Sequence, residues 1–119
     1  MPTPYEKDSN YCASHVSTAD VNSAVLVARP CRFTGANYNG GGTSRWIKLY
    51  DLATAPGTGD VPFMRLRTAA NAPTMTPAPE NGIWLENGLA IRITANVADD
   101  DATAITAGEV GLRAYYKID

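Results

Sequence analysis

The sequence is poor in the residues that carry out catalysis or hold metal ions. Its single histidine, His15, could form a nucleophile and base pair with Cys12 or Cys31, the two cysteines of the chain. His15 and Cys12 lie in a segment without periodicity, where the preorganisation that catalysis needs is hardest to supply. Two cysteines and one histidine also fall short of the four ligands of a structural zinc site. The sequence therefore predicts that the protein is not an enzyme and holds no cofactor and no metal ion.

Long apolar runs and runs of basic residues are also missing. No stretch approaches the roughly 20 apolar residues of a membrane-spanning helix, and residues 1–8 lack the charged and apolar regions of a signal peptide. Ten Lys and Arg against twelve Asp and Glu give a net charge of −2. Because no basic run accompanies this balance, the electrostatic footprint of a nucleic-acid binder is missing. We expect no membrane and no nucleic acid among the partners, and reduced thiols at Cys12 and Cys31.

Helical periodicity is nearly absent, and short segments that alternate between apolar and polar residues take its place. The densest spans residues 45–51, where Ile47 and Leu49 would face a core. The opposite row of this segment consists of Trp46, Lys48 and Tyr50. Further segments with strand character lie at residues 23–29, 31–38, 61–68, 83–94 and 109–118. Such a pattern is typical of a sheet buried on one side and predicts an all-β protein.

Glycine, proline and asparagine mark the connections between these segments. Residues 37–42 and 52–60 are predicted turns, and residues 69–82, with three prolines, are a predicted long irregular crossover between sheets. Asn87-Gly88 lies between two alternating runs and predicts a tight type I′ turn or a short bulged hairpin. The resulting prediction is one antiparallel, jelly-roll-like β-sandwich over residues 23–119, preceded by an extended N-terminal arm at residues 1–22.

The sequence offers two candidate binding sites, one for calcium and one for a sugar, and for each a purely structural interpretation is favoured. Asp99, Asp100 and Asp101 could contribute oxygens to a calcium ion, but the EF-hand spacing is absent and a solvated loop tip is favoured. Aromatic residues could form a platform on which a sugar stacks, although aromatic residues in strands more often belong to a core or a subunit contact. The platform would consist of Tyr38, Trp46, Tyr50 and Trp84.

Four blocks between residues 24 and 118 carry a recognisable pattern. They are Arg-Trp-Ile-Lys-Leu-Tyr-Asp-Leu-Ala-Thr-Ala-Pro at 45–56, Gly-Ile at 82–83 with Asn-Gly-Leu-Ala-Ile at 87–91, Asp-Asp-Asp-Ala-Thr-Ala-Ile at 99–105, and Tyr-Tyr-Lys at 115–117. In order and spacing these blocks resemble a group of small virion proteins encoded by tailed bacteriophages. The resemblance implies a capsid decoration (cement) or vertex protein with a β-sandwich fold, and it brings no catalytic or cofactor residues with it.

The resemblance also sets the expected partners and location. It implies that the protein binds the major capsid protein or other virion proteins in many copies, as a homo-oligomer, in a virion assembled in the host cytoplasm. Trp, Tyr and Arg are the residues that interfaces favour. We therefore expect the contacts to be made by outward-facing Trp46, Tyr50, Trp84 and Arg92. The alternative hypothesis is a carbohydrate- or receptor-binding β-sandwich module of a phage head fibre or tail.

Overall fold

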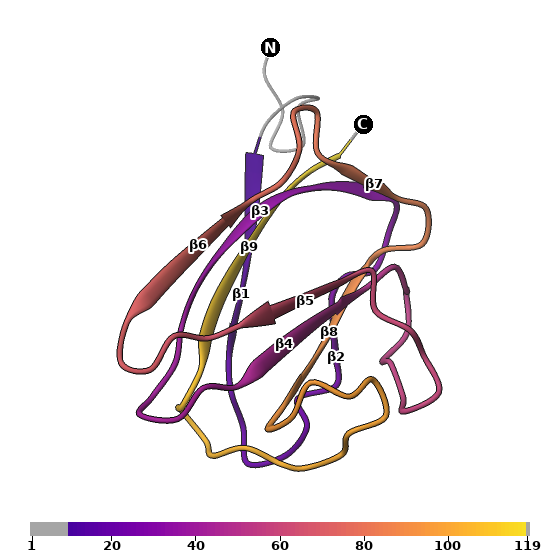
Figure 1. Ribbon diagram of the computed structural model, residues 1–119. Coiled ribbons are helices and arrows are strands. Elements are labelled where there is room, and N and C mark those ends of the chain that lie inside the picture. Colours follow the sequence, from indigo (N-terminus) through magenta and orange to yellow (C-terminus); the bar gives the residue numbers. More distant parts are fainter. Residues whose placement is uncertain (1–9, 119) are drawn as a thin grey trace.

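The computed structural model describes residues 10–118, which form strands and no helix. Figure 1 shows the strands in two layers. The strands are β1 (Asn10–Val16), β2 (Ala24–Val27), β3 (Cys31–Asn39), β4 (Trp46–Tyr50), β5 (Met64–Arg67), β6 (Pro73–Pro77), β7 (Ile83–Leu85), β8 (Leu89–Thr94) and β9 (Gly111–Lys117). Within this part of the chain there is also no helix long and apolar enough to cross a membrane.

The strands form two antiparallel sheets whose order is that of a jelly roll. Sheet A has the order β1-β9-β3-β6, with β7 also paired to β3, and sheet B has the order β2-β8-β4-β5. Four nested antiparallel pairs account for this order: β4 with β5, β3 with β6, β2 with β8, and β1 with β9. A long hairpin of this kind, rolled up so that its pairs alternate between two sheets, is a double-sheet jelly roll. The predicted all-β, jelly-roll-like sandwich is confirmed.

The core lies between the sheets and follows the alternation of the sequence. Ile47 and Leu49 of β4 are fully buried, as the pattern of residues 45–51 predicts. They pack with the inward rows of β3, β8 and β9, among which Phe33, Ile91 and Leu112 belong to the same hydrophobic cluster. Successive residues of a strand point to opposite faces of its sheet, so one row from each strand fills the space between the layers.

The predicted irregular crossover at residues 69–82 is wrong in part, because it contains strand β6. Pro73 and Pro77 stand at the two ends of this strand. Proline is tolerated there because β6 is an edge strand, which needs hydrogen-bond partners on one side only. The predicted turn at 37–42 was placed too early, since β3 continues through Asn39 and the turn follows it.

The predicted tight hairpin at Asn87-Gly88 is wrong, because β7 belongs to sheet A and β8 to sheet B. The connection passes between the two layers instead of reversing within one. Asp51, just after β4, organises it, since its carboxylate accepts hydrogen bonds from the backbone N–H groups of residues 86–88 over 2.9 to 3.4 Å. Gly88 has φ +157°, and a Cβ there would lie 2.3 Å from the carbonyl oxygen of Val27.

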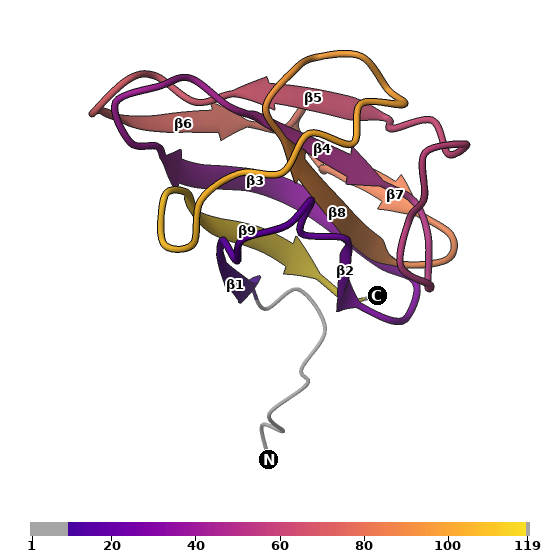
Figure 2. The same cartoon turned by 90° about the horizontal axis from the view of Figure 1, so that it is seen from below.

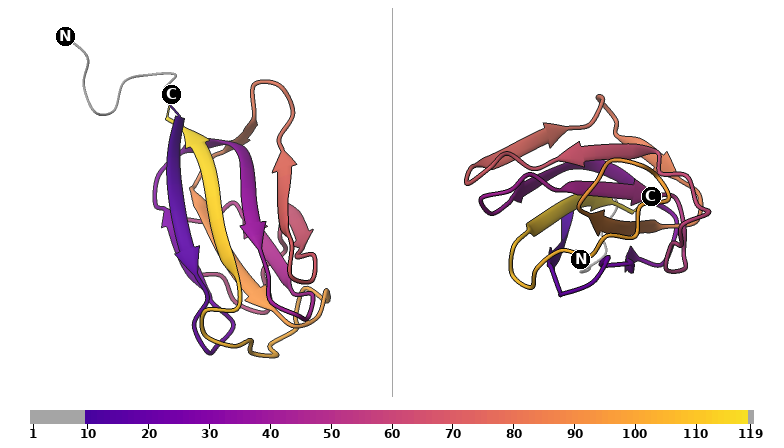
Figure 3. Two further views of the ribbon diagram at one scale, coloured as in Figure 1. Left: turned by 90° about the vertical axis from the view of Figure 1, so that its left-hand side faces the viewer. Right: turned by 60° about the horizontal axis from the view of Figure 1, so that its bottom comes forward.

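The predicted N-terminal arm, residues 1–22, is described only from residue 10. Residues 10–16 of it form β1, which pairs with β9 along its whole length, from Asn10 opposite Lys117 to Val16 opposite Gly111. Residues 1–9 lie outside the described residues. The left-hand view in Figure 3 shows β1 at the margin of sheet A, beside β9.

Candidate functional site

Two of the four predicted interface residues point away from the core but are buried. Tyr50 has an exposed fraction of 0% and Arg92 of 1%, so the expectation that they contact a partner through an open surface is wrong. Trp46 is half-buried and Trp84 is exposed, on β4 of sheet B and β7 of sheet A respectively. Because the predicted aromatic residues are split between two sheets, and Tyr38 and Tyr50 are buried, they do not form one sugar-binding platform.

The outward side of sheet B is covered by the chain itself at Lys48 and Arg92, which are buried. Lys48 lies opposite Arg92 on β8 and opposite Arg65 on β5, so three cations form one row across the sheet. Like charges directly opposite one another destabilise a sheet unless they are neutralised. The loop at residues 95–105 supplies the neutralisation, and Figure 2 shows it, in orange, lying across β4 and β5.

The contacts between this loop and the cation row are specific. Lys48 Nζ donates to the carbonyl oxygen of Ala98 at 2.5 Å. Arg92 donates to the carbonyl oxygens of Asp99 and Asp101 at 3.0 and 2.7 Å. Arg65 holds the Asp99 carboxylate through two bonds of 2.7 Å, the paired geometry that arginine and carboxylate favour. The loop therefore lies over Lys48 and Arg92 of sheet B, while the Asp99 side chain remains 35% exposed, in line with the predicted solvated loop tip.

The surroundings of Lys48, Asp99 and Tyr50 shift the pKa values of these side chains. Burial lowers the pKa of Lys48, and the adjacent charge of Arg92 lowers it further. The hydrogen bonds from Arg65 lower the pKa of Asp99. Burial raises the pKa of Tyr50, while neighbouring Arg92 opposes the rise, and the Tyr50 hydroxyl has no hydrogen-bond partner of normal geometry among the described residues. The donors of Lys48 and Arg92 point at the loop, so this cluster holds the fold together and offers no open binding site.

The candidate catalytic residues Cys12, His15 and Cys31 do not form a nucleophile and base pair. Burial raises the pKa of the Cys31 thiol to about 11, so it is not a thiolate near neutral pH. Cys12 is exposed and not bonded to Cys31. His15 Nε2 lies 2.8 Å from Asn22 Oδ1, an oxygen that also accepts from the backbone N–H and the hydroxyl of Thr18. Within residues 10–118 no group of three His, Cys, Asp or Glu side chains could hold a metal ion.

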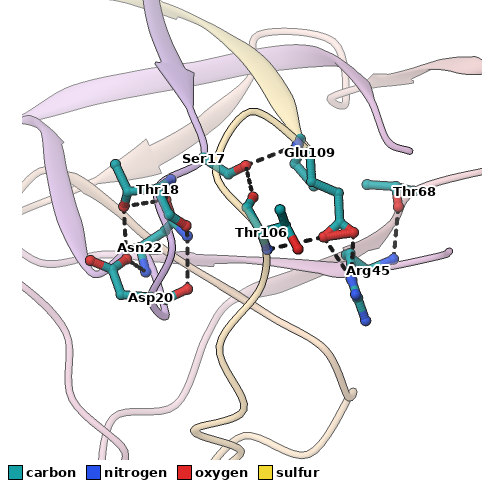
Figure 4. A network of polar contacts seen from close by, with 9 residues as sticks. Ser17, Thr18, Asp20, Asn22, Arg45, Thr68, Thr106 and Glu109 are labelled. Atoms are coloured by element: carbon teal, nitrogen blue, oxygen red, sulfur yellow. Dashed lines mark hydrogen bonds and ion pairs between the residues drawn. The ribbon is translucent and has the colours of Figure 1, made fainter. Parts of the chain in front are cut away.

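A polar network at one end of the sandwich, drawn in Figure 4, is also structural. Ser17 Oγ donates to the carbonyl oxygen of Thr106 at 2.9 Å and accepts from the Val110 N–H at 3.0 Å. Arg45 Nε lies 2.9 Å from the carboxylate of Glu109. Most of these bonds end on backbone groups of the loops that join the strands. The network ties these loops together and closes this end of the sandwich.

The outward side of sheet A, in contrast, is open. Of the five large hydrophobic side chains that are exposed in residues 10–118, three lie on it: Val16 at 66%, Met75 at 70% and Trp84 at 45%. We call this surface the sheet-A face. Its outward-pointing residues include Val16, Arg32, Asn37, Met75, Trp84, Arg113, Tyr115 and Lys117.

Two hollows shape the sheet-A face. One, with a volume of about 1140 Å³, is lined by residues that include Arg32, Asn37, Tyr115 and Lys117. The other is lined by residues that include Val16, Met75 and Arg113. Arg32 lies over the Trp84 ring at 5.7 Å from its centroid, and Asn37 donates to the Tyr115 hydroxyl at 3.0 Å. The face is thus a broad surface of aromatic, amide and cationic groups.

Acidic residues are confined to the connections between strands, whereas the strands of residues 10–118 carry only basic charged residues. Within residues 10–118 no strand contains Asp or Glu, whereas sheet A carries Arg32, Arg113 and Lys117, all on the sheet-A face. Glu80, which lines one of the hollows, belongs to the connection from β6 to β7. An electrostatic surface of this kind favours a partner with acidic groups. The sequence signal for it is the outward row of β9, where Arg113, Tyr115 and Lys117 alternate with the inward row.

Comparisons with known proteins give a structural likeness and no family. No protein-family model and no curated protein matches the chain. Among solved structures it is similar to the coat protein of Tobacco streak virus, with a TM-score of 0.42 and 12% identity, over 99% of this chain and 90% of that chain. The fold assignment rests on the strand pairing of this chain. No phage family is identified, so the resemblance to tailed-phage virion proteins stays a prediction.

Proposed function

We propose that the protein is a virion structural protein, a capsid decoration (cement) or vertex protein that binds a viral shell in many copies through its sheet-A face. The observation that carries the proposal is the difference between the two sheets. The centre of sheet B is covered by the protein's own loop at residues 95–105, whereas sheet A leaves Met75, Trp84 and Val16 exposed. Exposed apolar side chains that gather on one face mark an interaction surface, whereas scattered ones such as Val61 need no explanation.

The composition of the sheet-A face suits a protein partner. Trp84 beside Arg32 provides the large, adaptable contact area on which interfaces depend. The basic side chains of the sheet-A face lie on strands without Asp or Glu, and they favour a partner with an acidic surface. Many copies bound to one shell would strengthen a modest affinity of each copy. The sequence resemblance to tailed-phage virion proteins adds the major capsid protein as partner. In this role the protein is not an enzyme and acts by adding contacts to the shell.

Binding to shells tests the proposal. The probe is a shell prepared from the encoding virus with this gene deleted, mixed with purified protein and sedimented. We expect wild-type protein to sediment with the shells, and Trp84→Ser with Met75→Ser to weaken binding at least about tenfold, as expected for an interface centre. Val61→Ser is the matched control, because Val61 is 73% exposed but lies outside the sheet-A face.

Three results decide the outcome of the shell-binding experiment. Loss of binding in the double variant with binding kept in Val61→Ser supports the proposal. Equal binding of wild type and the double variant would place the contact on another surface. No sedimentation of wild type with these shells removes the decoration role.

A carbohydrate- or receptor-binding module of a head fibre or tail is the second candidate. The observation in its favour is that Trp84 lies against Arg32, which lines the same hollow as the polar side chains of Asn37 and Tyr115. Indole rings stack on sugars, and amides and hydroxyls bond to sugar hydroxyl groups. Quenching of tryptophan fluorescence by a glycan, lost in Trp84→Ser, would favour this candidate. No response across a broad glycan set removes it.

A further inference from the structure

The five edge strands of the sandwich, β1, β6 and β7 of sheet A and β2 and β5 of sheet B, are not equally protected against pairing with another chain. β7 has only three residues. β6 begins and ends with proline, and β5 exposes Arg65 and Arg67. β2 has only four residues and a register shift. β1 is seven residues long and contains no proline, lysine, arginine, aspartate or glutamate. Charges, prolines and short length are the devices that keep sheet edges from pairing, and β1 has none of them.

The free side of β1 can be assigned from its hydrogen bonding. The backbone N–H of Ser17, one residue beyond β1, donates to the Val110 carbonyl at 2.9 Å. Residues that bond to a given antiparallel neighbour alternate along a strand. Counting back from Ser17, the residues that bond to β9 are Tyr11, Ala13 and His15. The backbone groups of Asn10, Cys12, Ser14 and Val16 therefore point away from sheet A.

Both rows of β1 side chains are incompletely covered. Asn10, Cys12, Ser14 and Val16 are exposed, and the inward row of Tyr11, Ala13 and His15 is only half-buried. The inward row of the neighbouring strand β9 is buried by contrast, as at Leu112 and Ala114. An additional strand beside β1 would satisfy its free backbone groups and cover the half-buried row at the same time.

We propose that β1 pairs with β1 of a second copy, antiparallel and about a two-fold axis at Ala13. In this register Cys12 lies opposite Ser14 of the other copy, and Tyr11 opposite His15. In this register all seven residues of β1 pair with the other copy, and no two like charges lie opposite each other. Ala13, the smallest side chain of the strand, lies at the two-fold axis. The other edges fit a second copy less well, because two β5 strands would bring arginines together and β6 lacks two N–H donors.

The pairing has a consequence for the whole assembly. A two-fold axis within a continuous sheet is perpendicular to that sheet, so the two sheet-A faces lie on the same side of the dimer. Two copies would then present one bivalent surface. The dimer does not depend on the proposed shell contact, since β1 borders the sheet-A face and the shell variants Trp84→Ser and Met75→Ser lie on β7 and β6.

Paired charge variants test the interface. Cys12→Lys with Ser14→Lys places lysine opposite lysine twice in the dimer, and Cys12→Lys with Ser14→Glu places lysine opposite glutamate twice. Sedimentation velocity is expected to show a dimer of wild type, at twice 12.7 kDa. We expect the Lys/Lys variant to dissociate at about tenfold higher concentration, or more, than the Lys/Glu variant. Both variants change only exposed side chains on an edge strand, so a far-ultraviolet circular dichroism spectrum that matches that of wild type verifies folding.

A cysteine variant tests the register. Ser14→Cys sets the introduced thiol opposite the Cys12 thiol of the second copy, within the Cα separation of about 5.5 Å that a disulfide needs. A mild oxidant should therefore give a covalent dimer of Ser14→Cys, and not of Cys12→Ser with Ser14→Cys. A wild-type protein that stays monomeric at every concentration overturns the proposal. A dimer that is equally stable in the Lys/Lys and Lys/Glu variants also overturns it, because the contact then lies elsewhere.

Discussion

Single residues in this protein have roles that depend on what covers them. Arg92 is outward-pointing on sheet B, as its place in the alternation predicts, yet it is buried because the loop at residues 95–105 lies over it. Alternation assigns a side chain to one face of a sheet, but it contains no information on loops that cover that face. For this reason the interface prediction for Tyr50 and Arg92 is wrong, while the direction of their side chains is right.

Replacement of Arg92 should loosen the loop over sheet B. Arg92→Leu removes the donors to the carbonyl oxygens of Asp99 and Asp101, and we expect a loss of about 2 to 3 kcal/mol in the free energy of unfolding. Arg67→Leu is the matched control, since Arg67 is exposed on β5, and should change this free energy by less than about 0.5 kcal/mol. Urea unfolding measures both. Equal effects of the two changes would show that the Arg92 contacts contribute nothing.

Cys31 should make stability depend on alkaline pH. Burial raises its pKa from the ordinary value of 9.0 to about 11. A raised pKa in the folded state gives stability that is fully present below pH 9 and is lost as the pH rises towards 11, on the order of 2 kcal/mol. The difference in unfolding free energy between wild type and Cys31→Ala should shrink over this range. Cys12→Ala should show no such trend, and a constant difference for Cys31→Ala would contradict the assignment.

At the scale of elements, the sequence predicts strands more reliably than it predicts their partners. The strand at 45–51 and those around it were predictable because alternation and β-branched residues mark them locally. The sheet to which β7 belongs is decided by Cys31 to Phe33, about fifty residues away along the chain. Asn87-Gly88 therefore fits a hairpin by local chemistry, but long-range pairing makes it a crossing between layers.

Gly88 provides a test of that crossing. In Gly88→Ala the new Cβ would lie 2.3 Å from the Val27 carbonyl oxygen and 3.0 Å from that of Leu52, both backbone atoms. We expect a loss of about 3 kcal/mol in unfolding free energy. Gly59→Ala is the control, because no atom lies within 4 Å of its Cβ position, and it should be nearly neutral. A tight hairpin turn in solution would make Gly88→Ala far milder than this.

At the scale of the whole molecule, the decisive feature is the asymmetry between the two sheets. The fold class was predictable because strand signals recur along the chain and helical periodicity is missing. The sheet-A face was not, since the outward row of β9 and Trp84 are far apart in the sequence, and Met75 lies in a segment whose prolines argued against a strand. Its cations become a surface only when β3, β7 and β9 are placed side by side.

The central claim is the proposed virion role, and imaging of intact particles of the virus that this proposal implies tests it most directly. Averaged single-particle images should show density for a 12.7 kDa jelly roll on the shell. Within that density the sheet-A face, with Met75 and Trp84, should lie against the shell, and the loop at residues 95–105 should lie on the far side. Particles without such density, or with the sheet-A face turned to solvent, would contradict the account.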